Sequence, residues 1–487
     1  MAEIEIKSYR YTYAGAEKPS LDIENLSISR GETVLLIGSS GSGKTTLLRR
    51  LADQKGLRGE ASGELKNTLK SYGYVWQEPG AQMVCDRVEH EIVFGMENHG
   101  FSPEMMYRRL AEMTVFFGLE PIIKKDVIKL SAGQQQKVSI AGELAMDPEL
   151  LLLDEPTGLL DPVAAEDLAG LIKKIRDELG TTIIIAEQRA QLFMRSADRI
   201  IYMDGGKVLC DTTPKEIETL PDDKKELLYP YMPVPVKIAI QNGMPSEVYL
   251  DDRRLRSWFE EYISGDEISK KTANSKQSEN PEKSDILISA KGVYFRYEKN
   301  APYAVSDCEF SLEKGKVTFL VGGNGSGKTT LSQIVAGLLK ETHGKVRYNG
   351  IKKSDIAYLP SDPRYIFDEI IDVSVGERKW LAIEKIFEKN ALVYILDEPT
   401  AALDPSRKNA LKKMILEKTA AGKTLLIITH DMEFCAGTAD RMAMMYDGRV
   451  VAYDEKRRFF EDNIFYTTAL HRLTRGANNN ILIETDI

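Results

Sequence analysis

Two glycine-rich octapeptides of nearly the same sequence constrain this 487-residue chain more than any other feature. The first, GSSGSGKT, spans residues 38–45, and the second, GGNGSGKT, spans residues 322–329. Further motifs recur 284 residues apart in the early part of each copy and 243 residues apart in the later part. The chain is therefore an internal duplication whose second copy lacks about 41 residues (284 − 243), between Ser361 and Ser374.

Composition excludes several classes of protein. A chain of 487 residues is longer than one hydrophobic core supports, so two or three domains are expected. The 43% hydrophobic and 29% charged fractions are typical of soluble globular proteins, and a net charge of −9 argues against a nucleic-acid partner. No apolar run approaches the ~18 residues of a membrane span, and residues 1–10 have no apolar signal core. Any membrane role is therefore expected to depend on a partner.

The two octapeptides fit the GxxxxGK[ST] pattern of a phosphate-binding loop. Each follows an apolar strand-like run and precedes a helical pattern, which is the context that such a loop requires. Glycines allow backbone N–H groups to converge on the β-phosphate, the lysine reaches the β and γ oxygens, and the threonine hydroxyl ligates Mg²⁺. The predicted nucleotide contacts are Gly38, Ser39, Gly41, Ser42, Gly43, Lys44, Thr45 and Thr46, and in copy two Gly322, Asn324, Gly325, Ser326, Gly327, Lys328, Thr329 and Thr330.

Two apolar runs end in paired carboxylates. LLLLDEP contains Asp154 and Glu155, and VYILDEP contains Asp397 and Glu398. An apolar strand that ends in two acids would place the aspartate near Mg²⁺ and the glutamate near the attacking water. Taken alone such a pair is often only a strand end, but here it follows a phosphate loop in both copies.

The segment LSAGQQQKV, residues 130–138, is the third element. Ser131, Gly133 and Gln134 at a helix start could hold a γ-phosphate through N–H groups and the helix dipole. An ordinary N-capped helix is the alternative reading of the same residues.

Together these motifs, twice and in order, resemble ABC-type ATPases over nearly the whole chain. The resemblance implies an α/β fold of two P-loop NTPase domains in tandem, with ATP and Mg²⁺ as cofactors and an intramolecular dimer of the two domains. The expected domains are residues 1–262, with a helical subdomain at about 78–130, then a polar linker at 263–285, and residues 286–487, with a truncated helical subdomain. Tyr13 and Tyr297 match the aromatic residue that stacks on adenine, although a surface tyrosine is nearly as good a reading of each.

The sequence WQEPGAQMVCDRVEHEIVFGMEN in copy one is similar to the Q-loop region of energy-coupling factor transporter ATPases. Gln77 matches the Q-loop glutamine and Gln82 a second glutamine of that group. Such ATPases drive uptake of vitamins or transition-metal ions at the cytoplasmic face of the membrane. Their partners are an integral membrane coupling protein and a small membrane protein that captures the substrate. The metal ligands implied are Thr45, Gln77, Asp154, Thr329 and Asp397.

In this family each ATP lies between the Walker motifs of one copy and the signature of the other, which implies two composite sites. Site one combines Lys44, Thr45, Gln77, Asp154 and Glu155 with Ser374 and Gly376 of copy two. Site two combines Lys328, Thr329, Asp397, Glu398 and His430 with Ser131, Gly133 and Gln134 of copy one.

The two composite sites are expected to differ in activity. In site one the signature reads VSVGE, with Glu377 near a phosphate, and Gln188 stands where histidine is expected. Glutamine can donate a hydrogen bond but cannot gain a proton, so site one is expected to be impaired. Site two keeps Glu398, His430 and an intact signature and is expected to be the more hydrolytic, although Ser361 replaces its Q-loop glutamine.

Two other function classes remain open. A soluble tandem ABC ATPase acting on ribosomes or DNA is one, but the acidic charge and the short polar linker argue against it. A degenerate ABC regulator is the other, and the missing subdomain gives it mild support.

Overall fold

The computed structural model describes residues 2–52, 57–264, 286–367, 374–475 and 481–486. Its contacts divide the chain into two compact units, Met1–Met232 and Pro233–Ile487. This division falls before the boundary at residue 262 that the sequence suggests. Of the expected linker, only residues 263 and 264 lie within the described residues.

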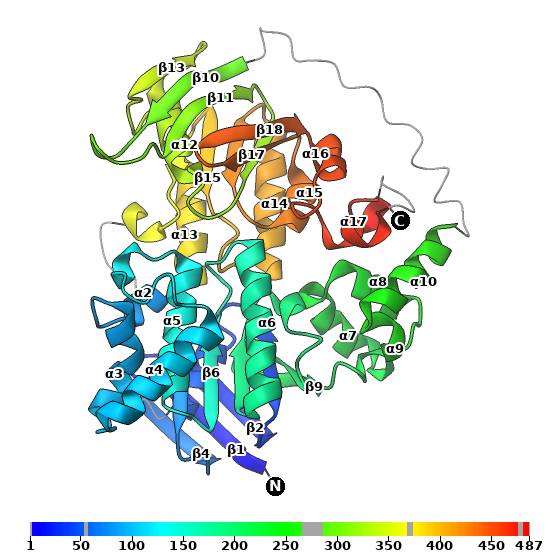
Figure 1. Cartoon of the computed structure of the whole chain (residues 1–487). Helices are drawn as coiled ribbons and strands as arrows, with labels where there is room; N and C mark the ends of the chain where they lie inside the picture. Colours follow the sequence, from blue (N-terminus) through cyan, green and yellow to red (C-terminus); the bar gives the residue numbers. More distant parts are fainter. Residues whose placement is uncertain (1, 53–56, 265–285, 368–373, 476–480, 487) are drawn as a thin grey trace. The chain divides into compact units, whose positions relative to one another are not determined.

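The central sheet of the first unit has strand order β5-β6-β7-β3-β8-β9. Its strands β6 and β9 are labelled in Figure 1. The strands are β5 (Tyr72–Val75), β6 (Leu150–Asp154), β7 (Thr182–Ala186), β3 (Thr33–Gly38), β8 (Arg199–Asp204) and β9 (Lys207–Thr212). The first five are parallel and β9 is antiparallel. β3, β6 and β7 are buried along their whole length, which explains their continuous apolar sequences.

A second sheet, with order β2-β1-β4, covers part of the first unit. It consists of β1 (Ala2–Tyr13), β2 (Leu21–Ser29) and β4 (Gly59–Asn67). Apolar side chains of β1 and β2 pack with helix α1 (Lys44–Leu51) and with strands of the central sheet in one core. This core holds α1 in place, and therefore also positions the phosphate loop that precedes α1.

Helices between β5 and β6 form the helical subdomain of copy one. They are α2 (Pro79–Gln82), α3 (Val88–Asn98), α4 (Pro103–Phe117), the 3-10 turn η1 (Val127–Lys129) and α5 (Ala132–Ala145). α2, α3 and α4 all contact α5. The unit continues with α6 (Pro162–Leu179), η2 (Ala190–Leu192), η3 (Ile217–Thr219), α7 (Asp222–Leu228) and η4 (Tyr229–Tyr231).

The second unit repeats both sheets, with orders β14-β15-β16-β12-β17-β18 and β11-β10-β13. The strands are β10 (Ile286–Phe295), β11 (Val305–Glu313), β12 (Val317–Val321), β13 (His343–Tyr348), β14 (Ile356–Leu359), β15 (Val393–Asp397), β16 (Thr424–Ile428), β17 (Arg441–Tyr446) and β18 (Arg449–Glu455). The helices are α12 (Lys328–Val335), η6 (Lys353–Asp355), η7 (Pro363–Ile366), α13 (Val375–Glu388), α14 (Pro405–Ala420), α15 (Met432–Thr438) and α16 (Lys456–Asp462). The prediction of two α/β copies is confirmed.

The shortened segment of copy two lies between β14 and α13. In copy one this stretch holds α2, α3, α4 and η1, whereas in copy two the described residues there contain only η7. Residues 368–373 fall outside the described residues. α13 contacts β14 and η7, and the equivalent helix α5 of copy one likewise contacts β5.

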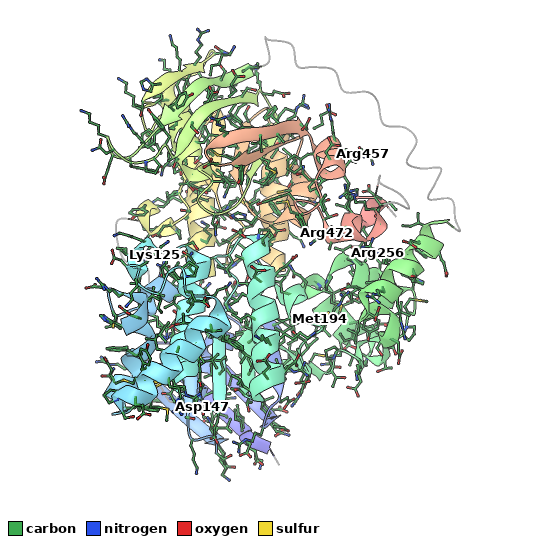
Figure 2. The ribbon with its side chains drawn as sticks, in the orientation of Figure 1. Lys125, Asp147, Met194, Arg256, Arg457 and Arg472 are labelled. Atoms are coloured by element: carbon green, nitrogen blue, oxygen red, sulfur yellow. The ribbon has the colours of Figure 1, made fainter. Side chains whose placement is uncertain are left out.

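A small helical cluster in the second unit is built from two distant parts of the chain. α8 (Val234–Gln241), α9 (Ser246–Tyr249) and α10 (Asp252–Ser264) pack with α17 (Ala469–Thr474), and a last turn, η8 (Glu484–Asp486), follows α17. Arg256 donates to the carbonyl of Arg472 at 3.2 Å, and both side chains are labelled in Figure 2. Lys237 forms an ion pair of 2.9 Å with Glu484. The residues after copy one and the tail of copy two therefore stabilise each other.

Within the described ranges, no helix has both the length and the apolar character needed to cross a membrane.

Candidate functional site

Backbone geometry in both octapeptides requires glycine. Gly38 and Gly322 have φ of 146° and 145°, and Gly43 and Gly327 have φ of 99° and 102°. A Cβ atom on Gly38 would lie 2.0 Å from the carbonyl oxygen of Met203, and one on Gly322 would lie 2.2 Å from that of Met445. A side chain at Gly38 or Gly322 would collide with β8 or β17. The positive φ at all four positions is one that glycine adopts far more readily than other residues.

The lysine of each loop is buried and folded over it. Lys44 Nζ donates to the carbonyl oxygens of Gly38 and Ser39 at 2.9 Å and to Ser42 Oγ at 3.1 Å. Lys328 Nζ donates to the carbonyl oxygens of Gly322 and Gly323, both at 2.9 Å. Each ammonium thus lies inside the curve of its loop, at the start of α1 or α12, where a phosphate would be held.

Hard oxygen donors suited to Mg²⁺ lie beside each loop. Thr45 Oγ1 donates to Asp154 Oδ1 at 3.0 Å, and the Tyr74 hydroxyl donates to Asp154 Oδ2 at 3.1 Å. In copy two both carboxylate oxygens of Asp397 are buried without a hydrogen bond of normal geometry among the described residues. Burial raises the pKa of Asp397, while the nearby hydroxyl of Thr329 opposes that change. A buried carboxylate whose oxygens accept no hydrogen bond of normal geometry fits a divalent cation.

The glutamate after each of these aspartates takes the same unusual backbone conformation. Glu155 has φ 45° and Glu398 has φ 48°. Gln77 Nε2 donates to Glu155 Oε2 at 2.6 Å, and Gln188 Nε2 donates to Glu155 Oε1 at 2.9 Å. In copy two His430 Nε2 lies 3.2 Å from Glu398 Oε1. The structure therefore places Gln188 and His430 equivalently, each against the glutamate of its own copy.

Glu187 is a buried acid that the sequence analysis missed. Only 1% of its surface is exposed, and Thr157 donates to its Oε2 through both N–H and hydroxyl, at 3.1 and 2.6 Å. Burial raises the pKa of Glu155 to about 8, and the charge of Glu187 adds to the effect. Copy two has a neutral pair here, Thr400 and Thr429, whose hydroxyls are 2.5 Å apart. A comparison of the two copies in sequence, with glutamate in one and threonine in the other, could have identified Glu187.

Both signature segments begin a helix. Ser131 caps α5, accepting from Gln134 N at 3.3 Å, while Gln134 Oε1 accepts from Ser131 N at 3.0 Å. Ser374 caps α13 and accepts from Glu377 N at 3.2 Å. Gly133 and Gly376 lie in the first turns. The capped-helix reading and the phosphate-clamp reading thus describe the same residues, because a helix start also presents free N–H groups.

The two aromatic residues near the start of each copy also lie beside their loops. The Tyr13 hydroxyl is 3.3 Å from Thr46 Oγ1, and that of Tyr297 is 2.9 Å from Thr330 Oγ1. Tyr297 is 64% exposed, so one face of its ring is open to a ligand.

Gln82 joins the Q-loop to the signature helix in copy one. Its Oε1 accepts from Trp76 N at 3.0 Å, and its Nε2 donates to the Tyr74 carbonyl at 2.8 Å and to Glu143 Oε1 at 2.9 Å. Glu143 belongs to α5, and burial raises its pKa to about 7. Gln82 therefore ties α2 to Trp76, the residue before Gln77, and to α5.

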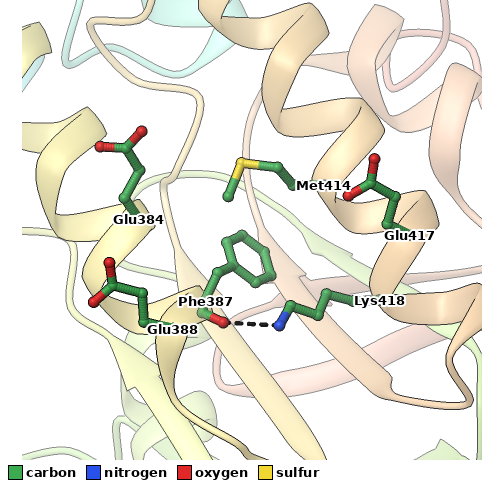
Figure 3. A pocket seen from close by; sticks show the side chains of 6 residues that line it. All are labelled: Glu384, Phe387, Glu388, Met414, Glu417 and Lys418. Atoms are coloured by element: carbon green, nitrogen blue, oxygen red, sulfur yellow. Dashed lines mark hydrogen bonds between the residues drawn. The ribbon is translucent and has the colours of Figure 1, made fainter.

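A pocket that is separate from the loops lies in copy two. Its volume is about 470 Å³, and it is open to solvent between α13 and α14 (Figure 3). Lys418 Nζ donates to the carbonyl of Phe387 at 2.8 Å at its edge. The lining residues are Glu384, Phe387, Glu388, Met414, Glu417 and Lys418. None of them is a predicted nucleotide contact.

Comparisons with known proteins agree with this geometry. A family model for ABC transporters matches residues 21–158 and 305–369. A Bacillus anthracis protein, provisionally named an ABC transporter ATP-binding protein, is 33% identical over 98% of this chain and 96% of its own length. A similarly named protein of Clostridium perfringens is 30% identical over 93% of this chain and 90% of its own length.

Among solved structures, the RNase-L inhibitor has a TM-score of 0.59 at 18% identity and covers 93% of this chain and 91% of its own. That likeness concerns the tandem fold alone. The chain belongs to the ABC transporter ATP-binding proteins. It is accordingly an ATPase with two ABC copies in one chain.

Proposed function

We propose that this chain is the ATP-hydrolysing subunit of a membrane uptake transporter of energy-coupling factor type, with a vitamin or metal-ion substrate. The observation that carries the proposal is the Gln82 network of copy one. It joins the segment that would receive a membrane partner to Trp76, directly before Gln77, and to the signature helix. The partners would be an integral membrane coupling protein and a small substrate-capturing protein, at the cytoplasmic face of the membrane.

The proposed mechanism assigns different tasks to the two copies. Bound ATP and Mg²⁺ would supply the phosphoryl group and its charge neutralisation. Lys328 and the N–H groups at the start of α12 would hold the phosphates, and Thr329 and Asp397 would hold the cation. Glu398 would orient the attacking water, and His430, 3.2 Å from it, would keep that carboxylate aimed. Ser131 and Gly133 of copy one would complete this site when the copies associate head to tail.

Site one would mainly hold nucleotide. Glu155 there is bracketed by two amides and lies near the buried Glu187, which disfavours its charged form. Lys44, Thr45 and Asp154 still provide the phosphate and cation contacts. Binding at site one would therefore outlast hydrolysis at site two.

Purification of the chain from gently solubilised native membranes tests the transporter assignment. One polytopic membrane protein and one small hydrophobic protein should be recovered with it, and the small protein would identify the substrate class. Recovery of ribosomes or soluble proteins alone would instead support the soluble tandem class.

A matched pair of variants tests whether the membrane partner binds the helical subdomain of copy one. Val84, between α2 and α3, is 67% exposed, and Val451 on β18 is 55% exposed. Val84→Asp should lower recovery of the membrane protein at least about tenfold, since a charge buried in an interface costs more than ~1.4 kcal/mol. Val451→Asp should leave recovery unchanged, and equal losses would contradict docking at the copy-one subdomain.

A further inference from the structure

A buried lysine reaches the hydrolytic centre of copy two from its signature helix. Lys379 lies on α13, five residues after the capping Ser374, and is 3% exposed. A buried ammonium is costly unless it is paired and hydrogen-bonded, so its surroundings indicate what it does. Copy one has the neutral Gln136 at the equivalent position, also buried.

The contacts of Lys379 join two strand ends. Its Nζ donates to the carbonyl of Ser361 at 2.7 Å and to the carbonyl of Asp397 at 3.3 Å. Ser361 follows β14, and Asp397 ends β15 directly before Glu398. The charges of Glu398, Asp397 and Asp362 favour the ammonium, while burial lowers the pKa of Lys379 to about 8.

In copy one a side chain of the Q-loop itself makes a similar link. There Gln77 spans from the Q-loop to Glu155, with Nε2 at 2.6 Å from Oε2. Ser361 occupies the equivalent place in copy two, and its side chain is shorter than that of glutamine. α13 packs against β14 and η7, so a long side chain on α13 can reach the residues that follow β14.

We propose that Lys379 is a positioning residue that replaces the Q-loop glutamine of copy two. It ties Ser361 to the turn that carries Glu398, and it supplies a positive charge that holds the Glu398 carboxylate toward the attacking water. It also couples the start of α13, which is the signature of copy two, to the hydrolytic centre of the same copy. The proposal rests on the assignment of hydrolysis to copy two.

Steady-state ATPase measurements on the full chain test this role. Lys379→Met keeps an unbranched side chain only one atom shorter and removes the charge, so the core is expected to stay packed. Its kcat should fall about 100-fold with KM for ATP changed less than about threefold, as expected when a reacting group is displaced by ~1 Å. Gln136→Met is the matched control in copy one and should lower kcat less than about threefold.

A second variant separates positioning from structural support. The double change Ser361→Gln with Lys379→Gln rebuilds the copy-one pattern and should recover at least about tenfold of the kcat lost in Lys379→Met. Unchanged kcat in Lys379→Met would overturn the proposal, as would a loss in the Met variant that the double variant does not recover.

Glu398→Gln, measured in parallel, reports on the underlying assignment. If Glu398→Gln retains turnover, the assignment of hydrolysis to copy two is wrong, whatever the result for Lys379→Met. If it abolishes turnover while Lys379→Met does not reduce it, only the role of Lys379 fails.

Discussion

His430 Nε2 lies 3.2 Å from Glu398 Oε1, in the unit formed by residues 233–487. The corresponding contact in copy one is made by an amide, from Gln188 to Glu155. An imidazole can exchange a proton with its partner near neutral pH, whereas an amide cannot. The two copies therefore share a geometry but differ in the chemistry available to them.

Replacement of each glutamate should reveal this asymmetry. Glu398→Gln should lower kcat for ATP by at least about 100-fold, because the water-orienting carboxylate is lost. Glu155→Gln should lower kcat less than about fivefold, because site one contributes little turnover. Both variants should still bind nucleotide, which fluorescent-ATP titration would verify. Equal losses of kcat would contradict the asymmetric mechanism.

Changes at Glu187 and Gln188 should activate site one. In a Glu398→Gln background, Gln188→His alone should change turnover little, because the buried charge of Glu187 remains beside Glu155. Glu187→Thr with Gln188→His reproduces Thr429 and His430 of copy two. This double variant should raise the residual turnover at least about tenfold, toward the contribution of a working general base. Phosphate release at saturating ATP measures it, and no gain would show that the signature of copy two limits site one.

Stability should depend on pH through Glu143. Burial raises its folded pKa to about 7 from the ordinary value of 4.5. The folded chain thus holds a proton that the unfolded chain releases, so this stabilising contribution is complete below about pH 4.5 and falls as the pH rises to 7. Glu143→Gln should flatten this part of the profile and raise the thermal midpoint at pH 8. Melting curves from pH 5 to pH 8 test it, with Glu112→Gln, on the exposed part of α4, as the control.

Loss of Phe259 should loosen the helical cluster of the second unit. Phe259 on α10 is fully buried, and truncation of such a ring costs about 3–5 kcal/mol. Phe259→Ala should therefore speed hydrogen exchange in both α10 and α17. Lys237→Ala removes only a partly exposed ion pair to Glu484, worth about 0–1 kcal/mol, and should change exchange little. Faster exchange in α10 without any change in α17 would contradict mutual stabilisation.

Periodic and repeated features were predictable from the sequence. The two offsets predict that β5 is equivalent to β14 and that β6 is equivalent to β15. The structure has strands at these equivalent positions. The loops, the capping serines and the strand-end carboxylates depend on neighbours close in sequence, so short motifs identify them.

The contacts of Glu187 and Lys379 depend on long-range packing, which sequence reasoning did not predict. Glu187 acts beside Glu155 only because β6 and β7 are neighbours, and Thr157, 30 residues earlier, supplies its hydrogen bonds. Lys379 reaches the end of β15 because α13 packs against β14, which pairs with β15. Glu187 lies next to Gln188, and Lys379 follows the signature of copy two, but their spacing in the sequence does not give these contacts.

The cluster of α8, α9, α10 and α17 shows that the residues on both sides of the polar segment 265–285 belong to one unit. Residues 252–264 before it and β10 after it belong to the same unit, Pro233–Ile487. The chain passes from one unit to the other at Met232 and Pro233, well before that segment. A cut within residues 265–285 would thus break the chain inside one unit, and the contacts of α8 and α10 with α17, no longer the covalent chain, would tie residues 234–264 to copy two.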